Sequence, residues 1–267
     1  MHDFENGNPG RLRDRREQKR GSASVIAVVA LVGFAAVACS STDAQRPASK
    51  DQRAVAPGST PTPTPVDVNA LPDDFAPLEP ATYSIDPDGD HSTRLRVVYD
   101  VPAGGWSQWE GAVKFADDAG HVGVSITTMT NIVRHGCRDH SPADPPVGPS
   151  VDDLAAALAD LAPFRVTSPP TDVTIYGYRG KHLELTVPDL PVEESGFTGC
   201  NGGNLHSWIG PLTDAFYGYT GPGYAEEFWI LDVEGTRLVI VAGRSPGSAP
   251  QDLAELRAIL DSIRIEP

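Results

Sequence analysis

The chain has 267 residues and a net charge of −15, with 36 acidic side chains against 21 basic ones. An acidic surface of this kind repels phosphate backbones and anionic lipid headgroups. The composition therefore argues against nucleic-acid binding and against attachment to a membrane through surface charge. Any contact with a membrane has to come from a lipid or from an inserted segment.

Residues 1–38 have the organisation of an export signal. A basic stretch from Arg11 to Arg20 precedes an apolar run at 24–38. That run has the length of a signal-peptide hydrophobic region and is shorter than the roughly 20 residues of a membrane-spanning helix. We therefore expect residues 1–38 to be a signal peptide.

The apolar run ends in Ala36-Val37-Ala38-Cys39. Small residues before a cysteine resemble the lipobox of bacterial lipoproteins, including those of actinobacteria, although Ala36 stands where that motif most often has Leu. The resemblance implies that the leader is removed and that Cys39 carries diacylglycerol, a palmitate-type anchor. The protein would then be held at the outer face of the cell membrane. The alternative is an uncleaved N-terminal signal anchor in which Cys39 is an ordinary thiol.

The next segment is rich in Pro, Thr, Ser and Ala, with Pro61-Thr-Pro63-Thr-Pro65 at its centre. Such a composition buries too little apolar surface to offset the entropy lost on ordering. We predict that residues 39–80 form the lipidated cysteine and a disordered linker. Residues 81–267 are then a single extracytoplasmic domain.

The first half of that domain contains segments in which apolar and polar residues alternate, and one predicted helix. Strands are predicted at 94–99, 111–115 and 121–133 from their β-branched and aromatic residues. A helix is predicted at 150–162, with Ser150 as its N-cap and acidic residues in its first turn.

Two hairpins and a second helix follow. Runs at 172–178 and 181–187 flank Arg179-Gly180, and runs at 227–233 and 236–242 flank Glu234-Gly235. A closing helix is predicted at 248–263, with Ser248 and Gln251 at the spacing of a capping box. Hairpins combined with two separate helices predict an α+β fold built mostly from antiparallel sheet.

Three segments, at 144–154, 177–187 and 229–240, resemble an uncharacterised domain of exported proteins from high-GC Gram-positive bacteria. That resemblance implies no activity. A strand hairpin closed by a C-terminal helix is also similar to the Mog1/PsbP-type sandwich that some actinobacterial lipoproteins carry. The similarity implies a binding or assembly module, and it transfers no site residue.

Two cysteines lie beyond the lipid attachment site, Cys137 and Cys200. In an oxidising compartment they are expected to form a disulfide. The competing hypothesis is a metal site, in which His135, His140 and His206 join reduced cysteines. Because the compartment opposes reduced cysteine, we favour the disulfide and expect no metal or other cofactor.

Catalytic motifs built on a serine nucleophile or a His-Glu-x-x-His pair are missing from the chain. The adjacent acids Glu193-Glu194 and Glu226-Glu227 would be the carboxylates of a cell-wall hydrolase. In so acidic a chain such pairs also arise by chance, so we favour a non-enzymatic role.

The aromatic-rich segment 208–229 is the candidate ligand surface of the domain. Trp208, Tyr217, Tyr219 and Tyr224 combine flat apolar faces with polar tips, which suits contact with a glycan or a protein. The alternative is that these rings cover the core. The sequence thus favours a lipid-anchored extracytoplasmic binding or sensor domain with a protein or cell-wall glycan partner. A cell-wall hydrolase and a structural envelope protein are the alternatives.

Overall fold

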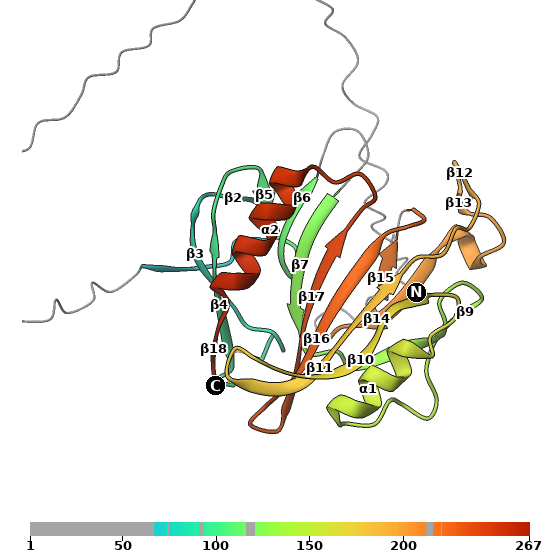
Figure 1. Cartoon of the computed structure of the whole chain (residues 1–267), viewed down its shortest axis with the longest axis horizontal. Coiled ribbons are helices and arrows are strands. Elements are labelled where there is room, and N and C mark those ends of the chain that lie inside the picture. Colours follow the sequence, from blue (N-terminus) through green and yellow to red (C-terminus); the bar gives the residue numbers. More distant parts are fainter. Residues whose placement is uncertain (1–66, 74, 91–92, 116–120, 212–215, 220) are drawn as a thin grey trace, which may run out of the picture. The chain divides into compact units, whose positions relative to one another are not determined.

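The fold is that of a computed structural model, which describes residues 67–267 except 74, 91–92, 116–120, 212–215 and 220 (Figure 1). The predicted signal peptide, Cys39 and most of the predicted linker lie outside the described residues. The described part is an α+β fold of mostly antiparallel sheets with two α-helices, as the sequence predicts.

An antiparallel sheet of eight strands forms the centre of the fold, and we call it the main sheet. In order across the sheet, its strands are β10 (Arg165–Ile175), β11 (Tyr178–Thr186), β16 (Ala225–Val233), β17 (Thr236–Arg244), β7 (His121–Thr127), β6 (Gly111–Phe115), β5 (Trp106–Ser107) and β2 (Pro77–Leu78). Alternate residues of a strand point to opposite faces, so the main sheet buries one apolar set on each side.

One face of the main sheet packs against helix α2 (Pro250–Ser262) and a second sheet. The strands of this second sheet are β1 (Val68–Ala70), β3 (Ala81–Ile85), β4 (Arg96–Val101) and β18 (Arg264–Glu266). Their shared core includes Tyr99 and Val97 from β4, Ile240 from β17 and Leu260 from α2. Burial of this apolar surface holds α2 and the second sheet to the main sheet.

The opposite face packs against helix α1 (Val151–Ala159) and a third sheet. The strands of this third sheet are β15 (Phe216–Tyr219), β14 (Leu205–Ile209), β8 (Asn131–His135) and β9 (Asp139–Pro142). A small hairpin of β12 (Val192–Glu193) and β13 (Gly196–Phe197) and a 3₁₀ turn at Asn201–Gly203 lie between β11 and β14 in the sequence. The core on this side includes Leu154 and Leu158 of α1 with Phe228 and Ile230 of β16.

The two helices begin in different ways. Ser150 caps α1: its Oγ accepts the backbone N–H of Asp153, and the Asp153 carboxylate accepts the backbone N–H of Ser150. The capping box predicted for α2 does not form, because Ala249 is the N-cap and Pro250 occupies the first turn. The Ser248 hydroxyl donates to the carbonyl of Ser245 instead.

The second predicted hairpin has the expected turn, and the first is displaced. Glu234 and Gly235 have φ values of 52° and 89°, as a two-residue turn with both central residues left-handed requires. The first turn lies at Tyr176-Gly177, with φ values of 53° and 89°, and not at Arg179-Gly180. Arg179 therefore belongs to strand β11.

Two other boundaries differ from the sequence prediction. The single strand predicted at 121–133 is two strands, β7 and β8, which belong to different sheets. Strand pairing also begins before residue 81, because β1 pairs with β3 and β2 pairs with β5. Val68–Ala70 and Pro77–Leu78 therefore contribute to the sheets, although the sequence assigns them to the linker.

Candidate functional site

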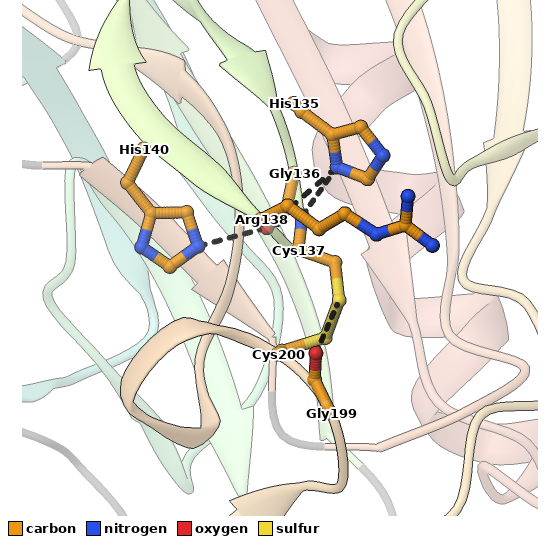
Figure 2. The surroundings of a disulfide bond; sticks show 7 residues. All are labelled: His135, Gly136, Cys137, Arg138, His140, Gly199 and Cys200. Atoms are coloured by element: carbon orange, nitrogen blue, oxygen red, sulfur yellow. Dashed lines mark hydrogen bonds between the residues drawn. A yellow bond between two sulfur atoms is a disulfide. The ribbon is translucent and has the colours of Figure 1, made fainter.

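Cys137 and Cys200 form a disulfide, in agreement with the sequence expectation (Figure 2). Their Cα atoms lie 4.5 Å apart, and the bond joins positions 63 residues apart in the sequence. The backbone N–H of Asn201 also donates to the carbonyl of Cys137 at 2.7 Å. The disulfide thus ties the end of β8 to the 3₁₀ turn before β14.

The histidines beside the disulfide hold its loop in place. His135 Nδ1 accepts the backbone N–H groups of Cys137 and Arg138, and His140 Nε2 donates to the carbonyl of Gly136 (Figure 2). Among the described residues, no group of three or more His, Cys, Asp or Glu side chains is arranged to hold a metal ion. Both sulfur atoms that the metal hypothesis requires are in the disulfide.

The four aromatic residues of the predicted ligand surface form a packed cluster. Tyr217 stacks on Trp208 with ring centroids 4.8 Å apart, Tyr217 contacts Tyr219 at 5.3 Å, and Tyr219 contacts Tyr224 at 5.8 Å. Trp208, Tyr219 and Tyr224 are buried, and Tyr217 is partly buried. The expectation of an exposed binding surface is corrected, because these rings fill the space between the third sheet and the main sheet.

A buried acid lies beside this aromatic cluster. Glu226 is 1% exposed, and the hydroxyl of Tyr219 donates to its carboxyl group. The same hydroxyl lies 2.6 Å from the Ser207 Oγ, while Glu226 Oε1 has no hydrogen-bond partner in the described part of the chain. Burial raises the pKa of Glu226 to about 8, so this carboxyl group is mainly neutral at pH 7.

The adjacent acids named by the sequence do not converge on one site. Glu226 and Glu227 are neighbours in β16 and point to opposite faces of the main sheet. Glu227 lies on the α2 side, where its Oε1 is 2.9 Å from Nε2 of His182. Glu193 and Glu194 are exposed at the β12–β13 hairpin. Neither pair has the facing carboxylates that glycoside hydrolysis uses.

An open pocket of about 440 Å³ lies on the α1 side of the main sheet, and we call it the charged pocket. Its wall is the start of α1, and its floor is the end of the sheet next to the β16–β17 turn. Its lining residues are Pro149, Ser150, Val151, Asp152, Asp172, Arg179, Gly180, Lys181, Asp232, Gly235 and Arg237. Three acids and three basic side chains thus meet in one place.

Two of the basic side chains in the charged pocket already bind neighbouring groups of the protein. Lys181 Nζ lies 2.6 Å from Asp172 Oδ1 and 3.0 Å from Asp152 Oδ1, which links β10, β11 and α1. These hydrogen bonds raise the pKa of Lys181 and lower that of Asp172. Arg237 donates to the backbone carbonyls of Gly148, Ser150 and Met129, so it fastens the loop before α1 to β17.

The remaining two charged side chains of the pocket, Arg179 and Asp232, make fewer contacts with the rest of the protein. Arg179 is exposed and makes no side-chain hydrogen bond or ion pair in the part of the chain that the structure describes. Asp232 is also exposed, and its Oδ1 accepts the backbone N–H of Gly235 at 2.8 Å. Sequence reasoning did not find this site, because its residues come from three distant segments and form no motif.

Comparison with known proteins identifies no family. No family model matches the chain, and no curated protein matches it. A solved structure, that of LpqN, involved in cell envelope biogenesis of Mycobacterium tuberculosis, aligns with 11% sequence identity and a TM-score of 0.30. The alignment covers 72% of this chain and 90% of LpqN. A score this low carries no argument about fold or function.

The helices that the structure describes are α1 and α2, and neither is long and apolar enough to cross a membrane.

Proposed function

We propose that the protein is a binding domain that a lipid on Cys39 holds at the outer face of the cell membrane, and that it takes a small polar ligand in the charged pocket. The pocket is the observation that carries the proposal. Its volume of about 440 Å³ falls in the range of small-molecule sites, and several polar side chains converge on it.

The framework of the charged pocket supports binding without large rearrangement. Its floor is made of paired strands, Lys181 connects those strands to α1, and Arg237 connects them to the loop before α1. A backbone framework held in this way loses little freedom when a ligand arrives, so more of the interaction energy remains as affinity. The proposed small polar ligand differs from the protein or cell-wall glycan partner expected from the sequence, and the charged lining of the pocket supports it.

The proposal for the anchor rests on the sequence. The basic stretch, the apolar run and the Ala36-Val37-Ala38-Cys39 motif precede the domain, and the Pro-rich segment separates them from it. An extended Pro-rich chain spans about 3 Å per residue, so this segment would hold the pocket well above the membrane surface. A ligand of the cell envelope would reach it there.

Nuclear magnetic resonance of the purified full-length chain tests the charged pocket. We expect a small-molecule extract of the cell envelope to shift the amide signals of Gly180 and Gly235, while Gly199 beside the disulfide stays unchanged. A double variant, Arg179→Gln with Asp232→Asn, should lose the shifts. A matched variant of exposed residues outside the pocket, Arg138→Gln with Asp189→Asn, should keep them. An extract that leaves Gly180 and Gly235 unmoved would remove the pocket from consideration.

A further inference from the structure

The floor of the charged pocket carries a row of alternating charge across three neighbouring strands. Asp232 of β16 is paired with Arg237 of β17. On its other side, Gly180 is paired with Leu231, so Arg179 lies next to Asp232 in the same register. Cβ atoms of cross-strand neighbours are about 5 Å apart and point to the same face. The row therefore reads positive, negative, positive on the α1 side of the sheet.

Only part of this row is available to a ligand. The guanidinium group of Arg237 is occupied by three backbone carbonyls, and the nearby Lys181 is held by Asp152 and Asp172. Arg179 and Asp232 remain, one of each sign. No ion pair joins them in the described structure, although they are neighbours in the sheet and both are exposed.

A complementary ligand would place an oxyanion against Arg179 and an ammonium group against Asp232. The planar guanidinium group of arginine binds carboxylate or phosphate through paired hydrogen bonds, and the carboxylate of Asp232 suits a cation. The lining includes no aromatic side chain, so the stacking that sugars and bases use is not provided. The protein also carries a net charge of −15, which repels ligands with net negative charge but not a ligand without net charge.

We propose that the charged pocket binds a small zwitterion, in which an ammonium group and a carboxylate or phosphate are joined by a short spacer. This assignment rests on the proposed function, because it names the class of ligand for the same pocket. Such a group occurs in free amino acids and short peptides, and also in the headgroup of ethanolamine lipids. Both sources share the chemistry that Arg179 and Asp232 would recognise.

Titrations of the full-length chain with defined probes test the ligand class. The probes are glycylglycine and glycerophosphorylethanolamine, together with N-acetylglycylglycine, which lacks the ammonium group, and glycylglycinamide, which lacks the carboxylate. We expect at least one of the two zwitterions to shift the amide signals of Gly180 and Gly235 in a saturable way. Arg179→Gln and Asp232→Asn should each weaken that binding at least tenfold, and Arg138→Gln and Asp189→Asn should leave it unchanged.

The outcomes distinguish a failure of the proposed ligand class from a failure of the proposed binding function. Preference for glycylglycine would indicate a peptide or amino-acid source, and preference for glycerophosphorylethanolamine a lipid headgroup; either supports the inference. Equal binding of N-acetylglycylglycine, or full affinity in Asp232→Asn, would overturn it. If the envelope extract shifts the pocket amides and neither zwitterion does, the ligand class is wrong and the pocket remains a binding site. If neither the extract nor any probe shifts them, both proposals fail.

Discussion

The hydroxyl group of Tyr219 donates a hydrogen bond to the carboxyl group of Glu226, and both side chains are buried in the core. Desolvation of a carboxylate in this position outweighs the stabilisation that the Tyr219 hydrogen bond provides. As a result, the pKa of Glu226 rises from 4.5 to about 8. The folded protein therefore holds a proton on Glu226 at a pH where the unfolded chain has lost it.

We predict that the free energy of unfolding falls as the pH rises from 6.5 to 8. Between about 4.5 and 8, the folded state binds one more proton at Glu226 than the unfolded state, and stability decreases with pH wherever this holds. The slope is at most about 1.4 kcal/mol per pH unit. His121, whose pKa is lowered by burial, gives an opposite slope that has fallen to about half at its unfolded value of 6.5 and fades over roughly the next pH unit. The upper part of the window therefore reports mainly on Glu226.

Urea unfolding measured at several pH values between 6.5 and 8 checks this prediction. The variant Glu226→Gln keeps the shape of the side chain without a titrating group, so its stability should be nearly independent of pH in this window. A wild-type protein with the same flat profile as Glu226→Gln would show that Glu226 is not buried with a raised pKa.

The disulfide should contribute strongly to stability. A cross-link between positions 63 residues apart lowers the entropy of the unfolded chain by an amount worth about 4 kcal/mol at 25 °C. We expect Cys137→Ser with Cys200→Ser to lose stability of this order in urea unfolding. Adding a reducing agent should destabilise the wild type and leave the double variant unaffected. Equal stability of the two proteins would mean that the bond does not form or does not constrain the chain.

Arg237 should be more important for stability than other arginines on the surface. Its guanidinium group donates to two backbone carbonyls in the loop before α1 and to one between β7 and β8, and a hydrogen bond to a charged group contributes about 1.5 to 3 kcal/mol. We expect Arg237→Ala to lower the free energy of unfolding by about 2 kcal/mol or more. Arg257→Ala, at an exposed position of α2, should change it by less than about 0.5 kcal/mol. Similar losses in the two variants would contradict this role.

The turn and capping preferences of residues close in sequence predicted the hairpin at Glu234-Gly235 and the cap of α1, because each feature depends on adjacent residues. The same preferences misplaced the first turn. Tyr176 adopts a positive φ that tyrosine rarely takes, and the pairing of β10 with β11 outweighs this preference. They also predicted a capping box at Ser248, where Pro250 sets the start of α2 instead.

The site was less predictable than the fold. Tyrosine and tryptophan are amphipathic, so a glycine-rich sequence cannot reveal whether Tyr219 and Tyr224 face solvent or the core; the third sheet buries them. The charged pocket depends on strand register, because Arg179 meets Asp232 and α1 only after the sheet has formed. Its one local signal was the cap at Ser150, which marked the start of α1.

The lipid anchor is the last prediction, and it concerns Cys39, outside the described residues. If the motif is processed as in other lipoproteins, the mature protein begins at Cys39 and carries acyl chains. Mass spectrometry of wild type from the membrane fraction should then give a mass that lacks residues 1–38 and includes the lipid. Cys39→Ser should not incorporate labelled palmitate, and Cys137→Ser should incorporate it normally. A wild-type chain in the membrane fraction that retains residues 1–38 and carries no lipid would contradict the lipobox prediction and favour the uncleaved signal anchor, because the basic flank and the apolar run then stay on the protein.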